Sequence, residues 1–234
     1  LQQQRGGTGP GHARVAAVHG GATLPERLRL YDGWAAGYEQ VPGPGKPGGA
    51  GPGPGPLRSP GPADRRAAAR RGLWHRARSL HRRGFRCLHG VDGSAGMLER
   101  ARSTGLYRQL RRCVLGQEPL PAPAEHYDAV TVVGALGEGQ VPSAAVPELL
   151  RVTKPGGFLC LTTRSNPSNL RYKAELEAAL ERLEGQGAWR KVLAQEVERW
   201  ERATSEEEST QGTGYISGVV YIYQKCPVPP VKEG

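Results

Sequence analysis

From Gly84 onward, the chain alternates short apolar runs with segments whose apolar residues recur at helical spacing. The apolar runs predict strands bounded by Gly and Pro, and they fall within residues 85–94, 111–121, 126–136, 158–164 and 218–226. Helices are predicted at 95–104, 144–152 and 169–203, with Ser94 as the N-cap of the first and a Pro-Gly-Gly turn at 155–157. This order predicts an α/β fold with a mostly parallel sheet.

The residues before this region follow three different patterns. Residues 26–40 predict a helix, because five apolar residues share one helical face: Leu28, Tyr31, Trp34, Ala35 and Tyr38. Residues 42–63 include sixteen Gly or Pro among 22 residues. They are predicted to be disordered, because they cannot bury enough apolar surface to offset chain entropy. The arginine-rich residues 64–83 have helical propensity but no continuous apolar stripe.

The net charge of +10 suggests an anionic partner, because clustered Lys and Arg bind phosphate. Residues 42–86, however, hold eleven Lys or Arg and one acid, whereas the remainder holds 21 basic and 21 acidic residues. The excess charge is therefore a property of one segment, and we do not expect nucleic acid to be the partner of the fold. A basic binding module for an anionic partner is the alternative that this segment leaves open.

Candidate chemistry lies where the predicted strands end, because ligands of open α/β sheets bind beyond the carboxyl ends of the strands. Asp92 follows a strand, so its carboxylate is placed to accept hydrogen bonds from a ribose diol; an ordinary helix cap is the alternative. Gln117 and Glu118 follow the next strand and are placed to reach an adenine edge, or they are plain turn residues.

Five stretches resemble successive motifs of class I S-adenosylmethionine-dependent methyltransferases: "YDGWAAGYE", "LHGVDGSAGMLERA", "YDAVTVVGAL", "LLRVTKPGGFLCLTTR" and "GVVYIYQK". The resemblance covers about residues 15–40 and 84–228. It implies one methyltransferase-like domain over 15–228, a Rossmann-like sheet of seven strands with a reversed last hairpin, and S-adenosylmethionine (SAM) as cofactor. The site residues it implies are Asp92, Gly93, Ser94, Met97, Gln117, Glu118, Gly134, Ala135, Leu136, Tyr31, Trp34 and Tyr38.

These residues have different expected places in the site. The loop from Gly134 to Leu136 is expected to line the methyl-transfer cleft. Tyr31, Trp34 and Tyr38 are expected on a helix that closes over the cofactor, although an aromatic stripe of this kind more often serves packing. No general base is assigned, and the catalytic residues stay unknown.

The sequence departs from the family at its first strand. The family has there an apolar run that ends in Asp and is followed by a G-x-G-x-G loop, whose glycines let backbone amides approach the cofactor. Here the corresponding residues 68–79 are "AARRGLWHRARS", which a buried central strand does not tolerate. The run "GGTGPG" at 6–11 is no substitute, because no strand precedes it.

The genetic code offers an explanation for this departure. When residues 68–79 are read one base later, the allowed codons include Leu-Leu-Asp-Val-Ala-Cys-Gly-Thr-Gly-Leu-Val-Ala, which is the missing strand and glycine loop. Trp74 followed by His75 even requires a glycine codon in the shifted frame. We hypothesise that residues 41–83 are a disordered or out-of-frame segment that replaces this part of the domain.

The predicted function is SAM-dependent methyl transfer to an unknown acceptor, a small molecule or a protein, impaired by the missing glycine loop. A non-catalytic pseudoenzyme that keeps the fold as an interaction surface is the alternative, beside the basic binding module. No apolar run spans a membrane and no signal peptide is recognisable, so we expect a cytoplasmic protein. The four cysteines lack metal-binding spacing, so no metal is predicted. The oligomeric state stays open.

Overall fold

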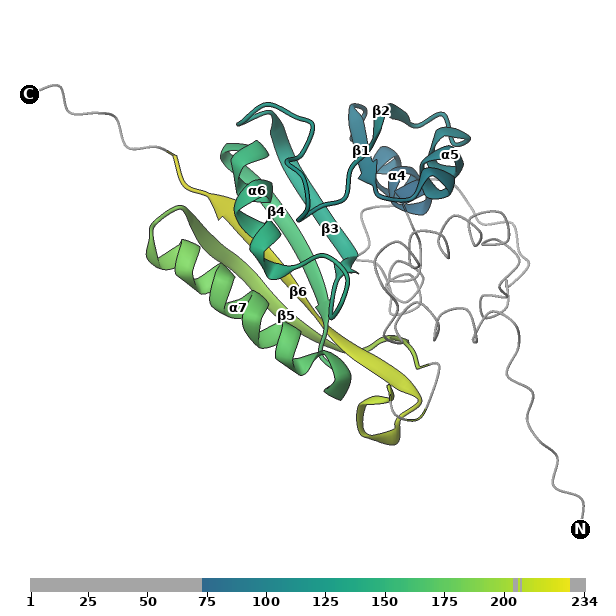
Figure 1. Cartoon of the computed structure of the whole chain (residues 1–234), viewed down its shortest axis with the longest axis vertical. Helices are drawn as coiled ribbons and strands as arrows, with labels where there is room; N and C mark the ends of the chain where they lie inside the picture. Colours follow the sequence, from purple (N-terminus) through teal and green to yellow (C-terminus); the bar gives the residue numbers. More distant parts are fainter. Residues whose placement is uncertain (1–72, 204–205, 207, 228–234) are drawn as a thin grey trace, which may run out of the picture. The chain divides into compact units, whose positions relative to one another are not determined.

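The computed structural model describes residues 73–203, 206 and 208–227. The chain divides into two compact units, Leu1–Leu110 and Arg111–Gly234, which are described separately below. No helix among the described residues combines the length and the apolarity needed to cross a membrane. Figure 1 shows the elements in sequence colours.

The first unit contains helix α4 (Leu73–Arg82), strand β1 (Leu88–Asp92) and helix α5 (Ala95–Arg102), and strand β2 (Tyr107–Arg112) begins in it. Its buried apolar residues come from these elements and are Ala77, Leu88, Met97, Leu98 and Ala101. β1 and β2 form a two-stranded sheet. Gly90 of β1 lies close to two side chains of β2: a Cβ there would lie 2.9 Å from Leu110 Cδ2 and 3.0 Å from Tyr107 Cε1, so these side chains would have to shift.

The second unit is built on a four-stranded sheet with the order β3-β4-β6-β5. Its strands are β3 (Tyr127–Leu136), β4 (Thr153–Arg164), β5 (Trp189–Arg202) and β6 (Tyr215–Lys225). β3 pairs with β4 in parallel, whereas β6 pairs antiparallel with both β4 and β5. β5 and β6 are therefore the reversed hairpin that the family resemblance implies.

Two helices cover one face of this sheet (Figure 1). They are α6 (Val146–Val152) and α7 (Leu170–Gly185), and the short 3₁₀ helices η2 (Ser143–Ala145), η3 (Pro167–Asn169) and η4 (Thr210–Gly212) lie in the connections. Leu159 and Leu161 of β4 pair directly with Tyr223 and Tyr221 of β6, so these four residues share a face. All four are 2% exposed or less, and the Tyr221 hydroxyl donates a hydrogen bond to Glu177 of α7. This face is the core of the second unit.

Most predicted elements are observed, and the differences have local causes. The predicted helix over 169–203 is wrong in its second half, because α7 ends at Gly185 and residues 189–202 form β5. Gly187 adopts a φ of +69°, which ends helical geometry, and pairing with β6 then outweighs the helical propensity of the following residues. The Pro-Gly-Gly run at 155–157 lies inside β4 instead of forming a turn.

The expected sheet of seven mostly parallel strands is not what the structure shows. The described residues form six strands in two sheets; β3 and β4 are parallel, whereas β6 is antiparallel to β4 and β5. The strand predicted within 111–121 is found earlier, as β2 at 107–112. The predicted helix at 26–40 lies outside the described residues. Of the segment 41–83, only residues 73–83 are described, and 73–82 form α4. An α/β fold is confirmed, whereas the full sheet is not.

Trp189 at the start of β5 provides a test of this core. It is 1% exposed, its Nε1–H donates to Leu180 O at 3.0 Å, and its ring lies 4.5 Å from that of Tyr223. Trp189→Ala is expected to lower the free energy of unfolding by about 3–5 kcal/mol, measured by urea denaturation. Val192→Ala on the same strand, where the residue is 51% exposed, should change it by no more than about 0.5 kcal/mol. Equal effects would contradict this description of the core.

Candidate functional site

The carboxyl end of β1 carries the predicted ribose-binding acid. Asp92 is the last residue of β1, and its Oδ1 accepts a hydrogen bond from the Ser94 N–H at 2.9 Å. Ser94 is fully buried and caps α5, because its Oγ accepts from the Met97 N–H at 3.1 Å. Gly93 joins the two residues. Asp92, Gly93, Ser94 and Met97 therefore form one local cluster, in which Ser94 is the helix cap and Asp92 closes the turn before it.

The turn after β2 holds Gln117 and Glu118. Glu118 Oε1 accepts from the Val114 N–H at 2.7 Å, and the Gln117 N–H donates to Val114 O at 3.0 Å, so both residues close the turn. Gly116 has a φ of +94°, and a Cβ there would lie 2.5 Å from Pro142 Cγ. Glycine is therefore required where this turn packs against the loop that follows β3.

A charged pair supports the chain just after this turn. Glu148 of α6 accepts the Leu120 N–H at 2.6 Å and binds Arg151 through both carboxylate oxygens, at 2.6 and 2.8 Å. The Arg151 hydrogen bonds hold the pKa of the Glu148 carboxyl below its ordinary value. Burial, together with the charges of Glu118 and Glu148, raises the pKa of the Cys113 thiol. Cys113 is therefore a buried neutral thiol and not an activated nucleophile.

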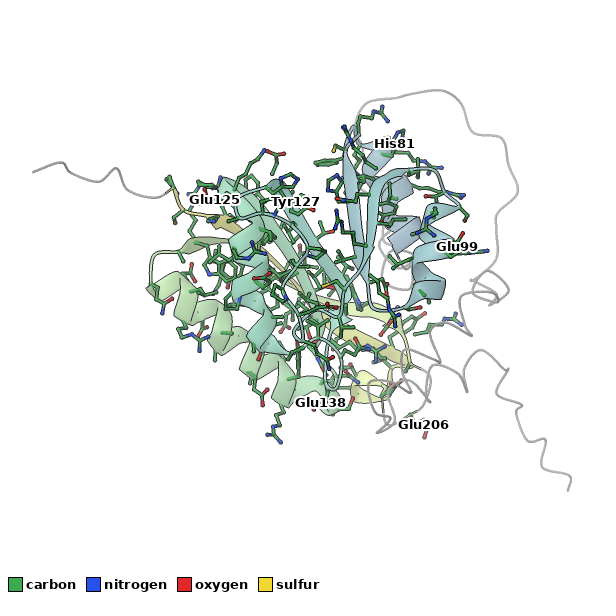
Figure 2. The ribbon with its side chains drawn as sticks, turned by 45° about the horizontal axis from the view of Figure 1, so that its top comes forward. His81, Glu99, Glu125, Tyr127, Glu138 and Glu206 are labelled. Atoms are coloured by element: carbon green, nitrogen blue, oxygen red, sulfur yellow. The ribbon has the colours of Figure 1, made fainter. Side chains whose placement is uncertain are left out.

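The predicted cleft-lining residues Gly134, Ala135 and Leu136 lie at the carboxyl end of β3. The register between β3 and β4 is irregular between Val132 and Leu136, and Gly134 has a φ of +68°. Side chains of β4 bind this irregular backbone: Thr162 Oγ1 accepts from the Gly134 N–H, and Thr163 Oγ1 donates to Leu136 O, each at 3.0 Å. Figure 2 shows Glu138 at this end of β3 and Tyr127 at the other.

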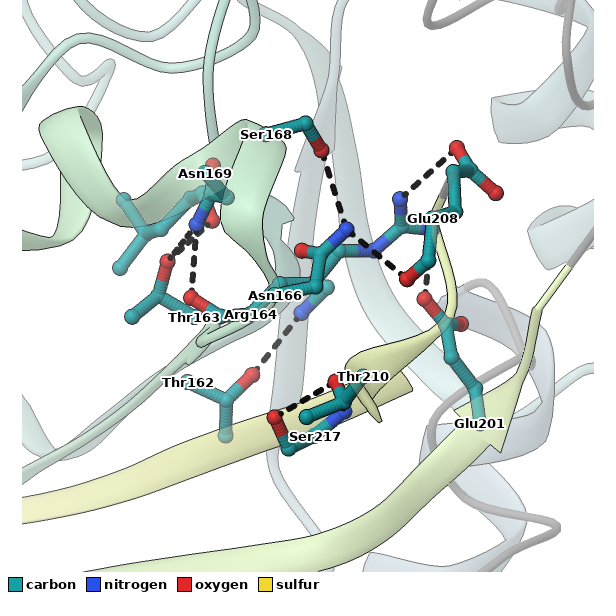
Figure 3. Close-up of polar contacts among 12 residues, drawn as sticks. Thr162, Thr163, Arg164, Asn166, Ser168, Asn169, Glu201, Glu208, Thr210 and Ser217 are labelled. Atoms are coloured by element: carbon teal, nitrogen blue, oxygen red, sulfur yellow. Dashed lines mark hydrogen bonds and ion pairs between the residues drawn. The ribbon is translucent and has the colours of Figure 1, made fainter. Parts of the chain in front are cut away.

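Asn169, which the sequence analysis did not identify, joins the loops after β3 and β4 (Figure 3). Its Oδ1 accepts from the Glu138 N–H at 2.9 Å, and its Nδ2 donates to Thr163 Oγ1 at 3.0 Å and to Arg164 O at 2.7 Å. Asn169 and Thr163 are only 4% and 2% exposed. The only available signal was the polar run "SNPSN" at 165–169, directly after a predicted strand.

A second polar cluster closes the end of β4. Arg164 NH2 lies 2.5 Å from Glu201 Oε1 and Arg164 NH1 lies 3.8 Å from Glu208 Oε1, as Figure 3 shows. Asn166 is fully buried and donates to Ser168 Oγ and Glu208 O, whereas its Oδ1 has no hydrogen-bond partner. The carbonyl of Glu208 can only accept, which fixes the orientation of the Asn166 amide. This cluster attaches the segment around Glu208 to β4.

The structure thus assembles the predicted site as two local groups. Asp92 to Met97 lie in the first unit. Gln117, Glu118 and Gly134 to Leu136 lie in the second unit, where the contact between Gly116 and Pro142 joins the turn after β2 to the loop after β3. Tyr31, Trp34 and Tyr38 lie outside the described residues. The part of the chain that the structure describes contains no group of three or more His, Cys, Asp or Glu that would hold a metal ion.

Comparisons with known proteins complete this description. Residues 72–161 match the family model described as "Methyltransferase domain". The chain is 48% identical over 227 residues to methyltransferase-like protein 27 of Homo sapiens, a match that covers 85% of this chain and 83% of the relative. The chain belongs to this methyltransferase family.

More distant methyltransferases also match. The demethylmenaquinone methyltransferase of Mycolicibacterium paratuberculosis is 34% identical over 108 residues, which cover 44% of this chain and 45% of the relative. A SAM-dependent methyltransferase of known structure, from Methanosarcina mazei, has a TM-score of 0.46 and 14% identity, and covers 65% of this chain and 87% of its own. Membership in the methyltransferase family implies the use of SAM.

The described residues fit this cofactor only in part. In the cluster from Asp92 to Met97, an acidic residue ends a strand just before the N-terminus of a helix. This arrangement suits the binding of a ribose. Residues 73–79, which take the place of the end of the family's glycine loop, are helical in α4. Only from Ala77 onward do the amides of α4 have acceptors within the helix, because the first four N–H groups of a helix, here those of residues 73–76, have none; Ala77 itself is fully buried. Each residue of α4 carries a Cβ, so its first turn lacks the open backbone of a glycine loop.

Glu148 provides a pH-dependent test of the second group. A carboxyl whose folded-state pKa is lowered stabilises the fold above its ordinary pKa of 4.5, and this contribution is lost as the pH falls through the lowered value. Glu148→Gln keeps an acceptor for the Leu120 N–H but removes the charge. It should reduce stability at pH 7 by about 1 kcal/mol, allowing for the exposure of Arg151, and flatten the loss of stability below pH 4.5. Urea denaturation between pH 3 and pH 7 measures both effects, and parallel curves would contradict the assignment.

Proposed function

We propose that this chain descends from SAM-dependent methyltransferases and that its own methyl transfer is impaired, because an arginine-rich sequence that continues into α4 stands where the family has its first strand and glycine loop. The observation that carries the proposal is the helical conformation of residues 73–82, next to an otherwise preserved strand end at Asp92. The family membership supports methyl transfer in general, and the local geometry supports the impairment.

An arginine-rich helix is a poor substitute for a glycine loop for two physical reasons. Beyond its first turn its amides bond within the helix, and each residue carries a Cβ that keeps the backbone away from a ligand. Its charge is also unfavourable, since SAM carries a sulfonium cation. Arg78 and Arg82 are exposed on α4, where they would repel such a group.

In an intact site, Asp92 and the Gly134–Leu136 segment have different roles. Asp92 accepts hydrogen bonds at the ribose, and the Gly134–Leu136 segment shapes the cleft where the acceptor approaches. Positioning of this kind supplies much of the catalysis in a group transfer, so the proposal requires no general base. We expect a small molecule or a protein as acceptor, because the balanced charge outside residues 42–86 gives no positive reason to choose nucleic acid.

The decisive test compares the chain with a repaired variant. In this variant, residues 68–79 are replaced by Leu-Leu-Asp-Val-Ala-Cys-Gly-Thr-Gly-Leu-Val-Ala. Isothermal calorimetry with SAM is expected to give no saturable binding for the chain itself and saturable binding for the repaired variant. A matched control carries the same replacement with alanine at positions 74 and 76, which keeps a strand-forming sequence but lacks both glycines. Its affinity should be at least about tenfold weaker than that of the repaired variant.

Two outcomes would refute the proposal. Equal affinity of the unmodified and repaired chains for SAM would show that α4 does not impair the site. Absence of binding in a repaired variant that folds, as judged by circular dichroism and a cooperative unfolding transition, would show that the loss lies elsewhere.

A further inference from the structure

At the carboxyl end of β3 and β4, hydrogen bonds between side chains of β4 and the backbone of β3 replace the regular backbone pairing of the two strands. Val130 and Val132 pair regularly with Leu159 and Leu161, and the register then shifts before Leu136 pairs with Thr163. Three residues of β3 thus face a single position of β4. Such irregularities occur often beside active sites, because they redirect the backbone, but they interrupt the ladder that would hold it.

At this irregularity, side chains form hydrogen bonds with the backbone of every second residue of the loop. Thr162 binds the Gly134 N–H, Thr163 binds Leu136 O, and Asn169 binds the Glu138 N–H. Gly134 has a φ of +68°, a conformation that a regular strand would not hold. The three hydroxyl and amide groups therefore fix a backbone that the sheet itself no longer fixes.

Asn169 is the centre of this arrangement. It bonds Thr163 Oγ1, and that same hydroxyl donates to Leu136 O, so the two residues form a continuous hydrogen-bonded chain (Figure 3). The orientation of the Asn169 amide is unambiguous, because Oδ1 faces an N–H and Nδ2 faces the carbonyl of Arg164. With 4% exposure, the side chain is shielded from competing water.

The far side of the loop is held as well. The Tyr172 hydroxyl donates to Val141 O at 2.6 Å, and the Val141 N–H donates to Ala135 O at 3.2 Å. Burial raises the pKa of Tyr172, so its hydroxyl stays a neutral donor. Tyr172 and Asn169 come from the same short stretch at the start of α7, which therefore anchors both ends of the loop from Ala135 to Val141.

From this geometry we propose that Asn169, acting through Thr163, is a positioning residue for the methyl-transfer cleft. It does not touch the reacting groups; it sets the conformation of the Gly134–Glu138 backbone that lines the cleft. This inference rests on the proposed function, which assigns the loop to the methyl-transfer cleft. Its structural part, that Asn169 fixes the backbone of the loop, rests on the hydrogen bonds alone. A loop that already has its binding conformation loses less conformational entropy when the ligand binds.

Hydrogen exchange on the full chain tests the structural part. Gly134 is the reporter, because its amide donates to Thr162 and not to Asn169. Asn169→Ala should accelerate exchange at Gly134 by about tenfold, while amides of β6 change little. Thr163→Val, which removes the hydroxyl at nearly constant shape, should act in the same way, and Thr163→Ser, which keeps the hydroxyl, should restore protection.

Tyr221→Phe is the matched control, because it removes a hydrogen bond of a buried residue in the same unit, between β6 and α7. It should leave exchange at Gly134 unchanged. The proposal is overturned if Asn169→Ala leaves Gly134 protected, or if it accelerates exchange uniformly over the unit as a purely structural residue would.

Calorimetry with SAM in the repaired variant tests the functional part. Asn169→Ala and Thr163→Val in that background should weaken SAM binding by about tenfold or more, whereas Thr163→Ser and Tyr221→Phe should not. Unchanged affinity in both variants would overturn the link to the cleft. Failure of the repaired variant itself to bind SAM is a different result: it rejects the proposed function, and the exchange experiment still decides the structural part.

Discussion

The central strand of a parallel sheet is buried on both faces, so it must be apolar along its whole length. The residues in the place of the family's first strand are rich in arginine, and burying them there would leave charges without partners. Residues 73–79 of this arginine-rich segment lie in α4, on which Arg78 and Arg82 are exposed. The described strands form two separate sheets.

Each unit nevertheless orders the backbone that follows one of its strands. In the first unit, Asp92 and Ser94 hold the turn between β1 and α5 in a defined geometry. In the second unit, Thr162, Thr163 and Asn169 hold the loop after β3. Both arrangements depend on contacts between residues close to the ends of neighbouring elements. Such contacts survive the change at residues 68–79, because none of them involves that segment.

The sequence predicts those features that depend on local patterns. The apolar runs identify β1, β3, β4 and β6, and the spacing of Ser94 before an apolar run identifies the cap of α5. The division between α7 and β5 was missed, because residues 189–202 have helical propensity and become a strand only by pairing with β6. Asn169 was missed as well, since its three partners lie on separate segments and no sequence spacing relates them.

The hypothesis that connects these findings is that residues 41–83 are read out of frame. It accounts together for the Gly and Pro excess, the confined positive charge and the missing glycine loop. Sequencing the transcript across the codons for Glu39 to Gly90 tests it most directly. We predict a shifted frame whose translation includes the apolar strand and the two glycines that α4 lacks. Confirmation of the printed frame would contradict the hypothesis and leave a methyltransferase relative whose central strand is truly lost.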